Sequence, residues 1–239
     1  MSNPSKLFFM MKTFIVFVTL TCSGVFAFAQ DNNIYVKGGV NLANISTTND
    51  GRIDDANMLT SFHIGVMGDV PLGKVLTLQP ALYFTGKGSK TQNGNPSDAS
   101  YFKATSNPYY VELPVNLVAK IALPGEGSNF FIGAGPYVAM GVAGKNKVEG
   151  KIFGIGFSNK ENIDFSNDDP TTFEEQEGAG LGSLRRFDYG LNATAGVQLN
   201  NVLFALNYGY GLAKINAVGD DEDDKNKHRV LSFSFGFRL

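Results

Sequence analysis

The chain has 239 residues and a formal net charge of −2, with 20 Lys and Arg residues against 22 Asp and Glu residues. This balance lacks the basic excess typical of nucleic-acid-binding proteins, and the single cysteine, Cys22, excludes an intramolecular disulfide. The 28 glycines, 20 phenylalanines and 9 tyrosines, without a tryptophan, favour strands and turns over long helices.

The first residues have the parts of a secretory signal peptide. Lys6 and Lys12 form a positively charged start, an apolar core follows over 14–20, and Ala27-Phe28-Ala29 provides a small-x-small cleavage site before Gln30. The apolar core is shorter than the ~20 residues that a membrane-spanning helix needs. We therefore expect the leader to be removed and the rest of the chain to be secreted.

The leader divides the chain into a signal peptide, residues 1–29, and a single domain, residues 30–239. Both Met1 and Met11 are suitable start residues, because the sequence from Met11 onward is already a complete signal. The residues before Cys22 make a poor lipoprotein site. After residue 29 no apolar run approaches ~18 residues, so only a closed barrel of strands could span a membrane.

Eight segments of this domain alternate between apolar and other residues with a period of two, which is typical of strands. None of the apolar rows contains a charge, as a lipid-facing surface requires, because a mid-bilayer Arg or Lys costs roughly 2–4 kcal/mol. In chain order the apolar rows are Ile34, Val36, Val40; Phe62, Ile64, Val66, Val70; Leu76, Leu78, Leu82, Phe84; Val111, Leu113, Val115, Leu117, Ile121; Ile132, Ala134, Val138, Met140; Phe187, Tyr189, Leu191, Val197, Leu199; Phe204, Leu206, Tyr208, Tyr210, Leu212; and Leu231, Phe233, Phe235, Phe237, Leu239.

The opposite rows mix polar residues with Gly and Ala, which suits the narrow lumen of an eight-stranded barrel. A soluble lipocalin-like barrel would instead show water a face of Lys, Glu and Thr, with little use for glycine. The alternation therefore indicates a barrel with its apolar rows outside. Six charges fall on the inward rows, and we expect them to form a lumen charge network: Lys37, Asp69, Glu112, Lys120, Asp188 and Arg238.

Within this network we expect Glu112 to pair with at least one of Lys37, Lys120 and Arg238 and so to close the barrel. Buried charges persist only when they are paired or hydrated. A small gated pore is the alternative for the same set of charges.

The predicted connections alternate in length. Long loops over 43–57, 87–108, 144–185 and 213–228 alternate with tight turns at 71–74, 124–127 and 200–201. Long extracellular loops and short periplasmic turns are typical of outer-membrane barrels. The sequence thus predicts an all-β fold: an eight-stranded antiparallel up-and-down transmembrane β-barrel in the cell outer membrane.

Three prolines, Pro80, Pro114 and Pro136, fall inside predicted strands, where each deletes a ladder hydrogen bond. A closed barrel has no free edge for them, so we expect β-bulges or local breaks there.

The final strand is the most regular of the eight. We expect Phe233, Phe235, Phe237 and Leu239 to face lipid and to serve as the assembly signal read by the barrel-assembly machinery. Deleting 237–239 should therefore abolish membrane insertion.

Few residues suggest chemistry. Of the two histidines, we expect His63 to lie in the lumen beside Tyr83 and His228 to lie on a loop surface. The acidic run 220–224 lacks the Gly and the terminal Glu of a calcium loop, and bridging to lipopolysaccharide through divalent ions is the alternative to a solvated loop tip. No hydrolase, zinc or phosphate-binding motif occurs, so we expect no enzyme activity, no cofactor and no metal.

Several segments resemble the PorT-like family of outer-membrane β-barrel proteins, often described as porin-like barrel domains. The similar segments occur in order and are Val36-Lys37-Gly38-Gly39-Val40-Asn41-Leu42, Leu78-Gln79-Pro80-Ala81-Leu82-Tyr83, Tyr110-Val111-Glu112-Leu113-Pro114-Val115, Gly133-Ala134-Gly135-Pro136-Tyr137, Arg186-Phe187-Asp188-Tyr189-Gly190 and Tyr208-Gly209-Tyr210-Gly211-Leu212. The resemblance implies that the prolines are recurring features. The name-giving member is linked to a protein-secretion and gliding apparatus, but fold similarity alone does not transfer that role.

We therefore expect a non-enzymatic barrel with a plugged polar lumen and a structural or binding role, for example as an accessory to a secretion or envelope complex. A narrow small-solute channel is the first alternative, and an enzyme at the barrel rim is the second. The expected partners are outer-membrane lipid and lipopolysaccharide, the barrel-assembly machinery and an unidentified envelope protein, with no nucleic acid.

Overall fold

A computed structural model describes residues 34–49, 52–54, 58–166, 183–215 and 227–239. The predicted signal peptide and the acidic run 220–224 lie outside the described residues. Within the described part of the chain, no helix has the length and apolar character needed to cross a membrane.

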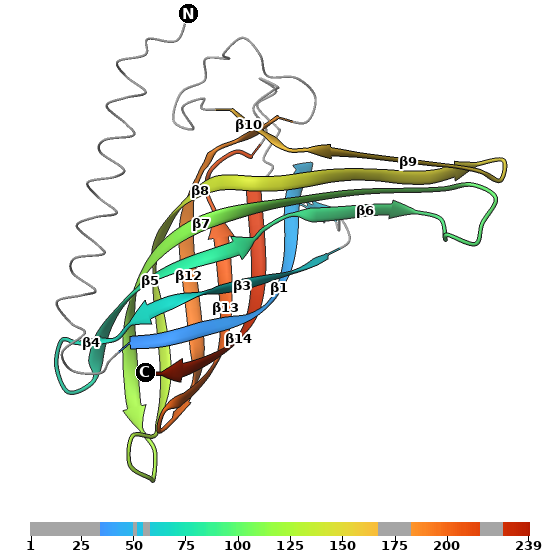
Figure 1. The fold of residues 1–239 in the computed structure, drawn as a ribbon. Coiled ribbons are helices and arrows are strands. Elements are labelled where there is room, and N and C mark those ends of the chain that lie inside the picture. The colour runs from blue at the N-terminus through green and yellow to red at the C-terminus, as the bar shows by residue number, and fades with distance from the viewer. Residues whose placement is uncertain (1–33, 50–51, 55–57, 167–182, 216–226) are drawn as a thin grey trace, which may run out of the picture.

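Eight strands form a closed ring in which each strand pairs antiparallel with its neighbours (Figure 1). Strand β14 returns to β1, from Tyr35 opposite Arg238 to Ser46 opposite Lys227, and so closes the barrel. The predicted fold class is thereby confirmed. In ring order the strands are β1 (Ile34–Asn49), β3 (Leu59–Gly68), β5 (Leu76–Gly86), β7 (Tyr101–Ala122), β8 (Asn129–Ile152), β12 (Phe187–Leu199), β13 (Val202–Gly211) and β14 (Lys227–Arg238).

The apolar rows face outward, as predicted. Ile132 is 55% exposed and Phe235 is 51% exposed, whereas the inward-facing Gln198 is only 4% exposed. A soluble protein would not place so many large apolar side chains in water, but a lipid-facing barrel requires them.

The short connections and the two ends of the described barrel lie together, at the end opposite the long connections. The backbone N–H of Leu239 donates to the carbonyl of Ile34 at 2.9 Å, and Arg238 donates to the side-chain oxygen of Asn201 at 2.8 Å. Asn200 begins a two-residue hairpin turn with φ of 54°, a left-handed conformation that asparagine tolerates better than most residues.

The prolines interrupt pairing in two places without shifting the register. Strand β5 is unpaired with β7 between Pro80 and Tyr83, and β7 is unpaired with β8 between Pro114 and Leu117. The local breaks expected there are thus observed. Pro136 lies in the second break, because the residue opposite it on β7 is Val115, which is unpaired with β8, while its pairing with Leu191 of β12 is kept.

A β-bulge occurs where none was predicted, between Tyr109 and Tyr110 of β7. It lies just below the point at which β7 and β8 leave the barrel wall.

Two of the predicted long loops are wrong, because most of their residues form strands. Residues 87–108 contain β6 (Ser89–Asn93) and the first part of β7, and residues 144–185 contain the end of β8, β9 (Ile155–Asn162), β10 (Asp164–Ser166) and β11 (Ser183–Arg185). Strands β6 and β9 flank the extended β7 and β8 as a four-stranded antiparallel sheet. We call this sheet, residues 89–93, 101–108 and 145–162, the arm.

The arm leads away from the barrel to one side (Figure 1). At about 3.3 Å per residue, 101–108 carries the sheet roughly 26 Å past the barrel wall. Its far end is the Phe153-Gly154 turn, where φ is 50° and 82°, and the Phe153 side chain is 90% exposed.

The other predicted loops are also shorter than expected. Strand β1 continues to Asn49 and pairs with β2 (Arg52–Asp54), while β14 already begins at Lys227. On the side of the short turns, β4 (Val70–Pro71) pairs with β5.

Candidate functional site: a polar lumen

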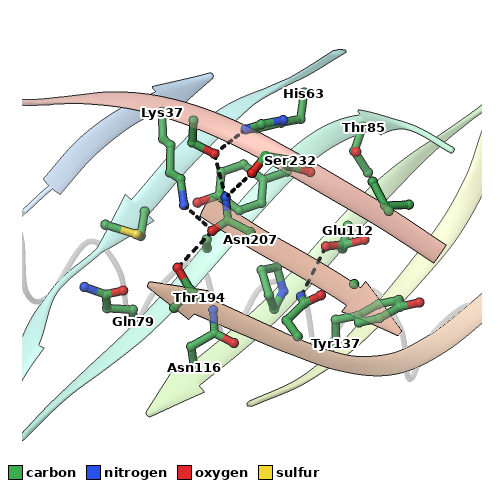
Figure 2. Close-up of a pocket in the computed structure, with 18 of the residues that line it drawn as sticks. Lys37, His63, Gln79, Thr85, Glu112, Asn116, Tyr137, Thr194, Asn207 and Ser232 are labelled. Atoms are coloured by element: carbon green, nitrogen blue, oxygen red, sulfur yellow. Dashed lines mark hydrogen bonds between the residues drawn. The ribbon is translucent and has the colours of Figure 1, made fainter. Parts of the chain in front are cut away.

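The barrel encloses a cavity of about 60 Å³ lined mainly by polar side chains from several strands (Figure 2). At ~10–15 Å³ for each water, it has room for about four water molecules. We call it the chamber, and its lining includes Lys37, His63, Glu112, Asn116 and Asn207.

The extracellular end of the chamber is built around Lys87, whose side chain is 3% exposed. Its Nζ lies 2.6 Å from Glu112 Oε2 and 2.8 Å from Asp188 Oδ2. The hydroxyl of Tyr137 donates to the same oxygen of Asp188 at 3.1 Å, and Lys87 Nζ lies 4.0 Å from the centre of the Tyr137 ring. Two carboxylates and an aromatic ring thus compensate one buried ammonium.

The sequence misses Lys87 because it assigns the residue to a loop. Lys87 directly follows β5, and its backbone N–H donates to the carbonyl of Pro108 at 2.9 Å, which keeps the strand direction. Its side chain therefore continues an inward row of period two, and extending that row beyond the assumed strand end would have identified it. The row is Gln79, Ala81, Tyr83, Thr85 and Lys87.

In the structure Glu112 pairs with Lys87 and forms no ion pair with Lys37, Lys120 or Arg238. The expected partners of Glu112 are therefore wrong. The lumen charges divide into separate groups rather than one network.

The middle of the chamber is held by hydrogen bonds to neutral polar side chains. Lys37 Nζ donates to Asn207 Oδ1 at 3.0 Å, and Lys37 has no carboxylate partner among the described residues. Asn207 also donates to Ser234 Oγ at 2.8 Å and accepts from Thr194 Oγ1 at 2.9 Å, as drawn in part in Figure 2. Polar contacts of this kind connect strands β1, β12, β13 and β14 through the interior.

His63 lies in the lumen beside Tyr83, as predicted, with the two ring centres 5.8 Å apart. One ring nitrogen lies 2.7 Å from Asn41 Oδ1 and the other 2.9 Å from Ser234 Oγ. Both nitrogens thus have neutral partners, and His63 bridges β1, β3 and β14 in the wall.

A second ion pair lies at the periplasmic end, where Lys120 contacts Asp69. Gln79 donates to Asp69 Oδ1 at 3.2 Å and Lys120 donates to Gln198 Oε1 at 3.3 Å. Arg238 is not part of this group, since its guanidinium binds Asn201 at the rim.

An apolar layer fills the periplasmic half of the lumen, and the sequence did not predict it. Its largest members, Tyr35, Phe131 and Leu203, are 1–2% exposed and come from the first residues of β1, β8 and β13. These strands are apolar on both faces there, so alternation gave no signal. The layer comprises Tyr35, Met67, Ala81, Val118, Phe131, Leu203 and Ala205.

A second apolar layer covers the extracellular end. Phe165 of β10 lies against Tyr110 with 5.9 Å between ring centres, and its ring occupies the space where a Cβ on Gly141 would sit, 2.2 Å away. The layer comprises Tyr110, Tyr137, Ala139, Ile163, Phe165, Leu184 and Ile215.

His228 was expected on a loop surface, and that prediction is wrong. It lies in β14, is 1% exposed, and has its Nε2 3.3 Å from the hydroxyl of Tyr110. The basic neighbours Lys225 and Lys227 suggested a loop, but the strand begins at Lys227 and turns His228 inward beneath the second apolar layer.

Closed antiparallel strands, an uncharged apolar exterior and a polar interior define the class of outer-membrane β-barrels. The chain matches the family model described as "Outer membrane protein beta-barrel domain" over residues 28–216. It therefore belongs to this family and is a protein of the cell outer membrane. Among the described residues, no cluster of three His, Cys, Asp or Glu side chains is arranged to hold a metal ion.

Solved structures of two outer-membrane proteins are similar to this chain. They are Ail, the attachment invasion locus protein of Yersinia pestis, at 13% identity and a TM-score of 0.37, and Neisserial surface protein A (NspA), at 14% identity and a TM-score of 0.40. The matches cover 86% and 87% of this chain, respectively, and 97% of each matched chain. These values support no conclusion about the function of this chain, and no curated protein matches it.

Proposed function

We propose that the protein is a non-enzymatic outer-membrane barrel with a plugged polar lumen and a structural or binding role in the cell envelope. The observation that carries the proposal is the position of the chamber between two apolar layers. Ions would have to cross Tyr35, Phe131 and Leu203 on one side and Phe165 on the other. Hydrophobic constrictions of this kind exclude water and ions from a pore.

The second candidate is a narrow channel for small solutes. It is favoured by the polar chamber and by Lys37, which has only neutral polar partners and so offers a positive charge to a passing anion. A rim enzyme has less support, because neither histidine is open to a substrate at the rim: both ring nitrogens of His63 are engaged in the lumen, and His228 is 1% exposed beneath the second apolar layer.

The narrower parts of the proposal rest on sequence features. The resemblance to the PorT-like family supports a role accessory to a secretion or envelope complex. The leader over 1–29 supports export and cleavage near Ala29, and the row ending in Phe237 and Leu239 supports recognition by the barrel-assembly machinery. Outer-membrane lipid and lipopolysaccharide are the proposed surroundings of the exposed apolar rows.

Planar-bilayer conductance of the refolded barrel tests the proposal. We expect no stepwise current from the parent protein, and current steps from a Tyr35→Ala/Phe131→Ala/Phe165→Ala variant in which both apolar layers are opened. Regular current steps from the parent would contradict the plugged lumen and favour the channel.

A further inference from the structure

The arm has two chemically different faces, and strand register assigns each residue to one of them. Residues directly opposite each other on antiparallel strands share a face, and successive residues alternate. Lys90 lies opposite Thr105, Thr105 opposite Lys147, and Lys147 opposite Lys160, so one row crosses all four strands. The other lysines fall on the same face, which we call the lysine face: Lys90, Lys103, Lys145, Lys147, Lys151 and Lys160.

Only one acidic side chain, Glu149, lies on the lysine face. It forms ion pairs with Lys103 and Lys147. The other four lysines of this face have no ion-pair partner among the described residues, and Lys151 instead donates to the carbonyl of Pro96 at 2.6 Å: Lys90, Lys145, Lys151 and Lys160. The opposite face carries a single charge, Glu161, and is apolar at its far end, with exposed Ile152, Ile155 and Phe157. Positive charge is therefore concentrated on one face of a protein whose net charge is −2.

This arrangement costs stability in the isolated chain. Lys147 and Lys160 are directly opposite each other, and like charges in that position destabilise a sheet. Lys90 lies in the same row, and strands spaced about 4.8 Å apart put it roughly 14 Å from Lys160. A row of ammonium groups at this spacing is suited to several anionic groups on one ligand, each of which would relieve the repulsion.

We propose that the lysine face binds the phosphate groups of lipopolysaccharide in the outer leaflet around the barrel. The positive charge of the lysine face favours a polyanionic ligand. The position of the arm favours lipopolysaccharide over other polyanions. The protein lies in the outer membrane, and the arm leaves the extracellular rim to one side of the barrel, beside the surrounding leaflet rather than over the mouth (Figure 1). The inference rests on the proposed binding role in the cell envelope and assigns that role a ligand and a site outside the lumen.

The test is a calorimetric titration of the full barrel in phosphatidylcholine nanodiscs with deacylated lipopolysaccharide, a soluble phosphorylated saccharide that cannot insert into the disc. Lys160→Gln should weaken binding about fivefold, and Lys90→Gln/Lys145→Gln/Lys160→Gln roughly a hundredfold, since each surface lysine contributes a similar increment. Raising the salt concentration should weaken saccharide binding by the parent protein until its affinity approaches that of the triple variant.

The matched control is Lys74→Gln, which removes the same charge from an exposed turn at the periplasmic end and should leave the affinity unchanged. Equal affinities for the parent and the triple variant would overturn the proposal, and so would equal binding of the dephosphorylated saccharide. Polyphosphate that binds as tightly as the saccharide would overturn the assignment to lipopolysaccharide. Because conductance reports on the lumen and this titration on the arm, the two proposals can fail separately.

Discussion

The lumen and the arm differ in the partners of their lysines. In the lumen Lys87 is 3% exposed and lies within 2.8 Å of two carboxylates, whereas on the arm Lys145 and Lys160 have no ion-pair partner among the described residues. Burial makes an unpaired charge costly, so Lys87 and Lys120 bind carboxylates and Lys37 binds the side chain of Asn207, while water lowers that cost on the arm. The comparison suggests that the lumen charges serve the barrel itself and that the arm charges are available to a ligand.

The largest effect should come from Lys87→Gln, which leaves Glu112 and Asp188 together in the lumen without a cation. We expect a loss of about 3–5 kcal/mol in the free energy of unfolding, because breaking a buried pair strands its partner charges. Urea unfolding in detergent, followed by the heat-modified gel shift of the barrel, measures the change. Lys145→Gln on the arm is the control and should leave the midpoint where it is.

A smaller effect is expected from Glu112→Gln, because Lys87 then keeps Asp188 at 2.8 Å. The loss should be about 1.5–3 kcal/mol, the range for a hydrogen bond to a charged group. Glu161→Gln on the arm provides the control, and the same unfolding assay applies. Equal unfolding midpoints for Glu112→Gln and the parent would show that Glu112 does not stabilise the lumen.

The Asn200 turn should give an effect of roughly 1–2 kcal/mol. Asn200→Ala places a Cβ-bearing residue without a local hydrogen-bonding side chain at φ of 54°, whereas Asn200→Gly accepts this conformation freely. The unfolding midpoint of Asn200→Ala should therefore be lower than that of Asn200→Gly. If alanine and glycine give the same midpoint, the left-handed turn does not limit stability.

The smallest effect concerns pH on the arm. Hydrogen bonds from Lys147, and next from Lys103, lower the pKa of Glu149 to about 2 from its usual 4.5. A lowered folded pKa means that the contribution of Glu149 is complete above pH 4.5 and is lost as the pH falls toward 2. NMR titration of the Glu149 carboxyl carbon should give a midpoint near 2, and the midpoint should rise in Lys147→Gln. A midpoint near 4.5 in the parent would show that the lysine contacts do not form in solution.

The barrel itself was predictable because a lipid-facing row must be apolar and uncharged over its whole length. That constraint is visible in one sequence, and the rows ending at Leu199, Leu212 and Leu239 follow it. The inward positions of Lys37, Asp69 and Asp188 follow from the same alternation.

The arm was not predictable by the same argument, because it extends beyond the barrel wall and neither of its faces has to form an uncharged apolar row. Strand β9 is exposed along its whole length and its residues resemble a polar loop. Without a required apolar row, alternation could not distinguish strand from loop. Lys87 was therefore assigned to a loop together with the residues that lead into the arm. The division of the lumen into separate charge groups depends on which strands face each other, and alternation along a strand does not report that.

The most direct measurement of the central claim is the reactivity of a thiol placed in the chamber. Cys22 lies in the predicted leader and is the only cysteine, so Thr194→Cys in the processed chain would carry a single thiol between the two apolar layers. A small charged methanethiosulfonate should leave this thiol unmodified until the barrel unfolds, while Lys145→Cys on the arm reacts at once. Reaction of the chamber thiol in the folded barrel at a rate comparable to that of the arm thiol would contradict the closed lumen.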